Sequence, residues 1–161
     1  MDEHTPAPGA MPPAGERARP RYKRPESVLV VVYTGLREVL VLRRRQPPDF
    51  WQSVTGSLEW EETDPLQTAR RELREETGLG DEVTFLRCRT VNRFPIVPPW
   101  RDRYAPDAVE NLEHVFHARL PERQPIVLNP AEHSEHVWLS RAAAAARVTS
   151  WTNRDAILQL P

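Results

Sequence analysis

The chain has a single cysteine, no long apolar run and almost no net charge. Cys88 has no partner for an internal disulfide, so we interpret it as a small buried side chain. No segment approaches the ~20 apolar residues that a membrane-spanning helix needs, and the N-terminus lacks the apolar core of a secretory signal. The formal net charge of -1 provides no field that would attract nucleic acid or a membrane. We therefore expect a cytoplasmic protein that binds neither nucleic acid nor a membrane. The sequence does not determine its oligomeric state.

The length of 161 residues corresponds to one domain. A chain of this size can bury roughly 70% of its unfolded surface. Residues 1–20 interleave proline with alanine and glycine and show no apolar period, which predicts a disordered tail. Residues 21–161 are expected to form the folded domain.

Apolar patterning predicts several strands around one central helix. Residues 27–33 are a nearly continuous β-branched run typical of a buried strand, and residues 39–42 return as the second strand of a hairpin. Other strands are expected over residues 50–55, 82–91, 112–120 and 136–139, with later helices opening at Ser140 and Thr152. This order favours a layered α/β protein with a mixed sheet.

The central helix is predicted to begin after Asp64, with Pro65 at its first position and Gln67 placed for a capping box, and to end at Gly78. Three acids, Glu72, Glu75 and Glu76, crowd its last turns, where the helix dipole disfavours negative charge. Glu72 and Glu76 also share a face, and such a pair costs roughly 0.2–0.5 kcal/mol. A bound divalent cation would reverse both penalties, whereas a solvated acidic face is the alternative interpretation.

The segment 56–79 resembles the Nudix box, because Gly56, Glu62 and the run from Arg71 to Leu79 match it in residue type. Eight residues rather than seven separate Glu62 from Arg71. The resemblance implies an α/β/α sandwich and a hydrolase that needs Mg²⁺, with Mn²⁺ as a substitute. It further implies Glu72, Glu76 and Glu132 as metal ligands, catalytic roles for Glu72, Glu75 and Glu76, and an Arg71 that pairs with Glu62. The general base is left open between Glu75 and Glu132.

Sequence pieces outside the box resemble the branch of the family that hydrolyses a pterin triphosphate to the monophosphate and pyrophosphate. The small-molecule substrate contacts that this resemblance implies are Lys23, Arg44, Thr55, Arg93, Phe94, Pro95, Ile96 and Ser150. The alternatives are a Nudix enzyme acting on dATP or an oxidised purine nucleotide, and a non-catalytic nucleotide-binding module. The second is disfavoured because all three box acids are present.

A cluster of two histidines and two glutamates over residues 132–136 suggests zinc as a rival. The zinc helix motif H-E-x-x-H needs two residues between its glutamate and its second histidine, and this run does not have that spacing. A polar loop that enters a strand is therefore the preferred interpretation.

Overall fold

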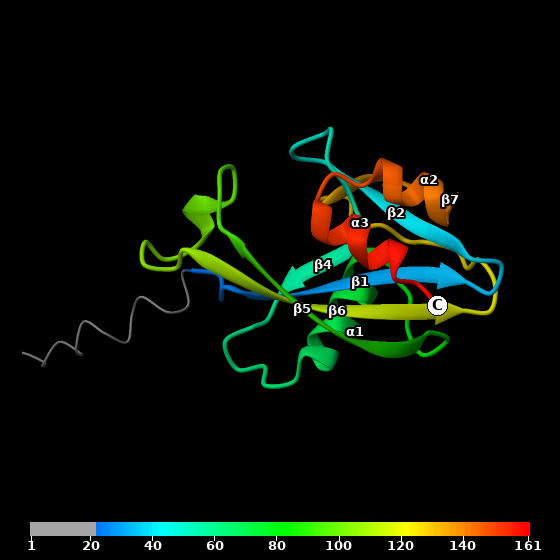
Figure 1. Ribbon diagram of the computed structural model, residues 1–161, viewed down its shortest axis with the longest axis horizontal. Helices are drawn as coiled ribbons and strands as arrows, with labels where there is room; N and C mark the ends of the chain where they lie inside the picture. Colours follow the sequence, from blue (N-terminus) through cyan, green and yellow to red (C-terminus); the bar gives the residue numbers. More distant parts are fainter. Residues whose placement is uncertain (1–21) are drawn as a thin grey trace, which may run out of the picture.

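The structure is a computed structural model that describes residues 22–161, so the predicted tail over residues 1–20 lies outside the described residues. Its centre is a seven-stranded sheet with the order β3-β2-β1-β6-β5, to which β4 adds by pairing with β1 and β7 by pairing with β2 (Figure 1). The strands are β1 (Glu26–Thr34), β2 (Glu38–Arg44), β3 (Trp51–Gln52), β4 (Val54–Ser57), β5 (Thr84–Pro95), β6 (Glu110–Leu120) and β7 (His133–Ser140).

Strand β1 is the middle of the sheet. It runs parallel to β6 and antiparallel to β2 and β4. The predicted hairpin is confirmed, although β1 and β2 pair in register only at Tyr33 and Val39. Farther from the turn the two strands separate, so β3 pairs with β2 and β4 with β1. The single strand predicted over residues 50–55 is therefore two strands, with Ser53 between them.

Helices cover both faces of the sheet. Helix α1 (Pro65–Thr77) packs on one face, where Leu73 joins Val28, Val30 and Phe116 in one core. Helices α2 (Arg141–Arg147) and α3 (Trp151–Leu158) cover the other face, where Ile157 packs with Leu29 and Val31. Successive side chains of a strand point to opposite faces, so β1 supplies both cores and is apolar from Val28 to Tyr33. The expected α/β/α sandwich is confirmed.

Three local predictions were wrong. Helix α3 begins one residue after Ser150, whose hydroxyl accepts a hydrogen bond from the Asn153 N–H at 3.3 Å, so Thr152 is not its cap. The capping box from Gln67 is not formed among the hydrogen bonds of residues 22–161, because Asp64 alone caps α1 through Leu66 N–H at 3.0 Å. Strand β5 continues to Pro95, beyond the predicted end, since β6 offers it a partner as far as Glu110.

The segment between β5 and β6 contains the short 3₁₀ helix η2 (Arg101–Arg103) and otherwise forms a loop. In the part of the chain that the structure describes, no helix combines the length and the apolar character needed to cross a membrane.

Candidate active site

The end of helix α1 places two carboxylates inside the protein. Gly78 closes the helix in the left-handed region at φ 76°, and its N–H bonds to Arg74 O at 2.9 Å, which confirms the predicted cap. Glu72 and Glu76 are only 8% and 2% exposed, whereas Glu75 is exposed. The interpretation as a solvated acidic face is therefore wrong for Glu72 and Glu76.

Burial perturbs both carboxyl groups. It is the main cause that raises the pKa of Glu72 to about 8, and the charge of Glu76 adds to it while Arg71 opposes it. Burial also raises the pKa of Glu76, against a hydrogen bond from His133. Two buried acids of this kind favour a bound cation, which would stabilise their ionised forms.

The box glycine makes room for this arrangement. A Cβ atom added to Gly56 would lie 2.0 Å from Cδ of Glu72. The Glu72 carboxyl group therefore lies directly against the backbone of β4, and only glycine allows such a close approach. This contact couples helix α1 to the strand that lines the neighbouring cavity.

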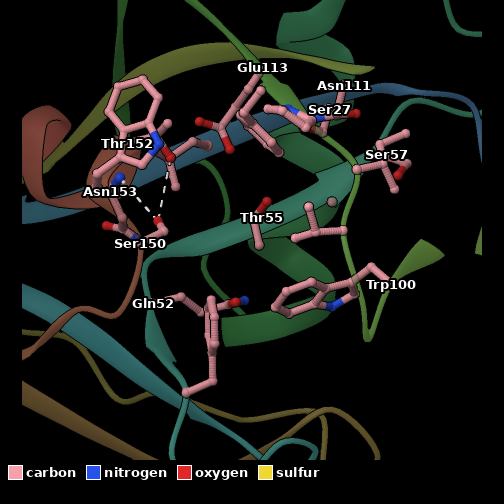
Figure 2. Close-up of a pocket in the computed structure, with 18 of the residues that line it drawn as sticks. Ser27, Gln52, Thr55, Ser57, Trp100, Asn111, Glu113, Ser150, Thr152 and Asn153 are labelled. Atoms are coloured by element: carbon pink, nitrogen blue, oxygen red, sulfur yellow. Dashed lines mark hydrogen bonds between the residues drawn. The ribbon is translucent and has the colours of Figure 1, made fainter. Parts of the chain in front are cut away.

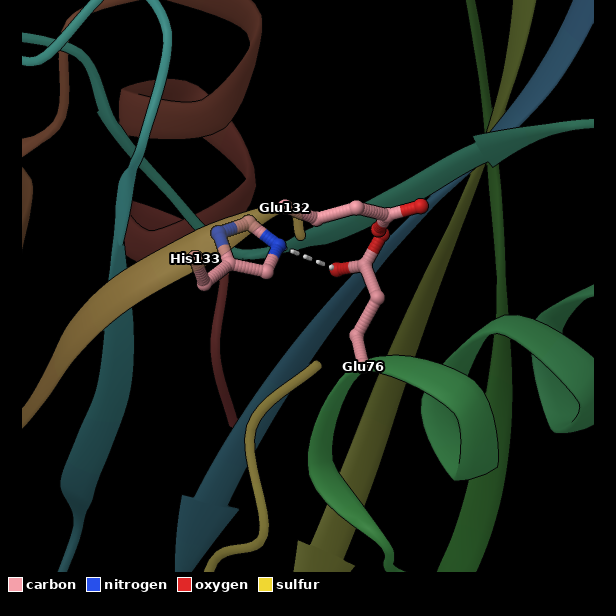
Figure 3. A group of neighbouring side chains, drawn as sticks. All are labelled: Glu76, Glu132 and His133. Carbon is pink, nitrogen blue, oxygen red and sulfur yellow. Dashed lines mark hydrogen bonds and ion pairs between the residues drawn. The ribbon is translucent and has the colours of Figure 1, made fainter. Parts of the chain in front are cut away.

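Glu132 and His133 join Glu76 in one group, called the acidic group below, although they lie far from α1 in sequence; Glu72 is not part of it. Ligand atoms of Glu76, Glu132 and His133 all lie within 4.8 Å of one another (Figure 3). His133 Nε2 is 3.1 Å from Glu76 Oε2, which fixes the orientation of that carboxylate. The resemblance indicated Glu132, whereas the role of His133 was missed. Its signal was its place in the cluster over residues 132–136, which was interpreted as a polar loop.

The oxygen-rich donor set suits a hard divalent cation, which takes carboxylate ligands. The raised pKa values of Glu72 and Glu76 also favour a bound cation, because a cation would offset the cost of ionising these two buried carboxyl groups. The run 132–136 suggested a zinc site formed by its own two histidines and two glutamates. In the described part of the chain these four side chains do not come together. Glu135 pairs with Arg43 at 3.4 Å, and His136 is exposed and outside the cluster.

Arg71 has the structural role that the resemblance implied. Its Nε and Nη2 atoms donate to the two oxygens of Glu62 at 2.8 and 3.1 Å, and Nη2 also donates to Ser57 O at 3.1 Å. These hydrogen bonds are the main cause that lowers the pKa of Glu62 to about 2, and Thr68 contributes a further bond at 2.6 Å. The extra residue in the box is therefore accommodated in the loop without breaking the pair.

A cavity of about 420 Å³ adjoins the acidic group, because Thr55 lines it and the backbone of Thr55 bonds to Glu76. Figure 2 shows residues that line this cavity. Six of the predicted substrate contacts line it: Arg44, Thr55, Phe94, Pro95, Ile96 and Ser150. The structure places the other two elsewhere. Arg93 is exposed and pairs with Glu110 at 3.4 Å, and Lys23 lies outside the lining, with its N–H bonded to Arg103 O at 2.9 Å.

Two cationic side chains, Lys23 and Arg44, lie near the acidic group, and Arg44 also lines the cavity. Arg44 Nη1 donates to Gln52 Oε1 at 3.2 Å, and the guanidinium group lies 5.9 Å from the Trp100 ring centroid. Partial burial and then the nearby Arg103 lower the pKa of Arg44, while Glu76 and Glu132 oppose this. The pKa of Lys23 is lowered first by partial desolvation of its ammonium group and then by Arg103, while Glu72 and Glu132 oppose the shift; the residue as a whole is exposed, so the desolvation is incomplete. Both cations therefore lie close enough to the carboxylates to interact with them electrostatically.

Several polar lining residues were missed by sequence reasoning. They are Ser27, Gln52, Ser57, Asn111, Glu113, Thr152 and Asn153. For the lining residues that lie in strands, the sequence did offer a signal. A polar residue at an inward-facing position of a mostly apolar strand indicates a polar site. Glu113 in β6 is the clearest example, because it is only 5% exposed.

The helix-borne carboxylates, the glycine beneath them and the adjoining cavity define a hydrolase of the Nudix class. The family profile of the NUDIX domain matches residues 23–160, and the chain belongs to this family. It is 46% identical to the dihydroneopterin triphosphate diphosphatase of Escherichia coli K12 over 142 residues, which covers 86% of this chain and 93% of that protein. The Haemophilus influenzae enzyme of the same name is 40% identical over 85% of this chain and 87% of its own length.

Solved structures agree with this assignment. The structure of the E. coli dihydroneopterin triphosphate pyrophosphohydrolase superposes with a TM-score of 0.80 at 45% identity, and the match covers 86% of this chain and 96% of that one. A Nudix hydrolase from Listeria monocytogenes superposes with a TM-score of 0.70 at 25% identity, over 84% and 91% of the two chains. Nudix hydrolases generally use a divalent metal, which fits the acidic group described above.

The raised pKa of Glu72 predicts how metal-free stability depends on pH. The unfolded carboxyl ionises near pH 4.5 and the folded one near pH 8, so Glu72 destabilises the fold progressively as pH rises through this window. Thermal melts in EDTA should show a smaller loss of melting temperature between these limits for Glu72→Gln than for the parent. Mg²⁺ should raise the melting temperature more at pH 8 than at pH 5, and an equal increase at both would contradict the expectation.

Proposed function

We propose that this protein hydrolyses dihydroneopterin triphosphate in the cytoplasm to dihydroneopterin monophosphate and pyrophosphate, with Mg²⁺ as its metal and Mn²⁺ as a substitute. The observation that carries the proposal is the 46% identity to the E. coli diphosphatase over nearly the whole of both chains. The cavity beside the acidic group is consistent with it, since its volume of about 420 Å³ lies within the range of small-molecule sites.

In this proposal Glu72, Glu76 and Glu132 hold the metal, and His133 orients Glu76. Glu76 and Glu132 already lie together with His133, whereas Glu72 is outside that group and is proposed from the family resemblance. The metal, when bound, supplies charge stabilisation at the phosphates and lowers the pKa of water. Lys23 and Arg44 neutralise the phosphate charge next to it. Glu75 is exposed and lies beside Arg71 at 3.3 Å, and it remains available to accept the proton of the attacking water. Thr55 and Ser150 contact the substrate from β4 and from the start of α3.

The apolar walls of the cavity favour one further candidate, an activity on dATP or an oxidised purine triphosphate. Phe50, Phe94, Ile96 and Trp100 present surfaces that can pack against any bicyclic ring. Purine nucleotides are therefore expected as weaker substrates, because losing one hydrogen-bonding partner costs ~1–3 kcal/mol.

The proposed reaction is tested by identifying the broken bond. Water is expected to attack the α-phosphorus, so hydrolysis in ¹⁸O-water should label the monophosphate and leave pyrophosphate unlabelled. A parallel series with dATP, dGTP and an oxidised purine triphosphate ranks the substrates by kcat/KM. Orthophosphate as the first product, or an efficiency with a purine nucleotide far above that with the pterin, would refute the proposal.

A further inference from the structure

A second buried carboxylate lies on the cavity wall, away from the acidic group. Glu113 of β6 is 5% exposed, and its hydrogen bond is with Asn92 Nδ2 at 3.2 Å. It forms no ion pair in the described residues. Burial raises its pKa, while Asn92 and Thr152 oppose the shift. A buried carboxylate without a cation is costly and calls for a ligand that donates hydrogen bonds.

Asn111 provides a second acceptor on the same wall. Its Nδ2 donates to Ser27 Oγ at 2.8 Å, and its Oδ1 is buried with no hydrogen-bond partner among residues 22–161. Ser27 pairs in register with Glu113 across β1 and β6, and Asn111 lies two residues before Glu113, so all three point to one face of the sheet. Figure 2 shows the three side chains together on one side of the cavity, across from Trp100 and Gln52.

The bicyclic ring of the proposed substrate has a matching edge. A dihydropterin carries a ring N–H at position 3 next to an amino group at position 2, which are adjacent donors that a carboxylate can accept in bidentate fashion. Adenine instead presents a ring nitrogen acceptor beside its amino group. The ring nitrogen of adenine would face a Glu113 oxygen, and neither of these two acceptors would receive a hydrogen bond. In a buried site, such an unpaired contact discriminates strongly against the wrong ring.

Resting on the function proposed above, we propose that Glu113, supported by Asn111, forms the subsite that binds the N–H edge of the pterin ring and rejects adenine. The Glu113 carboxylate accepts from N3–H and from one amino hydrogen. Asn111 Oδ1 accepts from the other amino hydrogen, which gives the orphaned oxygen its partner. The triphosphate then extends past β4 toward the carboxylates of α1.

Glu113→Gln tests this assignment because it keeps the size and the oxygen that accepts from Asn92, while replacing one acceptor with a donor. For dihydroneopterin triphosphate, KM should rise on the order of 10-fold or more with kcat changed little. For dATP, KM should fall, because an amide complements the adenine edge. The matched control is Glu110→Gln on the same strand, which is exposed, lies outside the cavity and should leave both substrates unaffected.

A ligand-side comparison separates recognition from a structural effect. Dihydroneopterin, without phosphates, and its analogue with an oxo group in place of the 2-amino group are compared as competitive inhibitors. The parent should prefer the amino compound on the order of 10-fold or more, and Glu113→Gln should lose that preference. Equal inhibition of the parent by both compounds, or a preference that survives in the variant, overturns the subsite. If the parent hydrolyses the pterin triphosphate in the same assay, the proposed function stands regardless of that outcome.

Discussion

Glu76→Gln is expected to lose at least ~10²-fold in turnover while it remains folded. The Glu76 carboxylate is almost fully buried, lies 3.1 Å from His133 Nε2 and shares the acidic group with Glu132. The amide preserves the shape and can still accept from His133, so the change removes mainly the negative charge. A metal-held charge is worth several kcal/mol in the transition state, and each 1.36 kcal/mol corresponds to a tenfold change in rate.

The same variant should be more stable than the parent in EDTA at pH 7, because it removes an ionisable group whose burial is costly. The measurements are turnover at saturating Mg²⁺ and melting temperature with and without the metal. Glu122→Gln, an exposed change of the same kind, is the control and should alter neither quantity. Near-normal turnover of Glu76→Gln would remove Glu76 from the metal site.

Gly56→Ala is expected to be the most damaging small substitution in the site. The new Cβ would lie 2.0 Å from Cδ and 2.1 Å from Oε1 of Glu72, so the carboxyl group or strand β4 has to move. Overpacking of this kind costs ~1–3 kcal/mol, and a misplacement of about 1 Å at an active site can cost ~10²-fold in rate. Both melting temperature and turnover should therefore fall.

Gly80→Ala is the matched control, because the nearest atoms to its added Cβ are the ends of Arg74 and Glu82 at 3.7 Å. It should leave turnover unchanged. The double variant Gly56→Ala with Glu72→Asp shortens the obstructing side chain, and it should recover melting temperature without recovering turnover. If the double variant melts no higher than Gly56→Ala alone, the clash is not with Glu72.

Local features of the chain predicted a large part of the site. The cap at Gly78, the N-cap at Asp64 and the shared helix face of Glu72 and Glu76 depend on residues within a few turns of one another, so a helical period is enough to place them. The buried strand β1 was also predictable from neighbouring residues. Both of its faces are covered, so its sequence is a nearly continuous apolar run. The pairing of Arg71 with Glu62 needed the family resemblance, since the loop between them has no regular period.

Local pattern reasoning failed where a choice depends on a distant partner. The division of residues 50–55 into β3 and β4 follows from the separation of β1 and β2 after their turn. Strand β5 extends to Pro95 because β6 lies beside it. The position of Arg93 is decided by the alternation of β5, which exposes its side chain next to Glu110 while Phe94 lines the cavity.

By itself the sequence determined the chemistry, because the acids at the end of α1, the glycine of β4 and the capping residues are fixed by short-range spacing. Tertiary structure decided which distant groups join them. Glu132 and His133 reach Glu76 because β7 pairs with β2, and Glu113 and Asn111 reach the cavity because β6 lies parallel to β1 with Ser27 opposite Glu113. Strand order and register are set by burial across the whole sheet rather than by neighbouring residues, so no local pattern contains them.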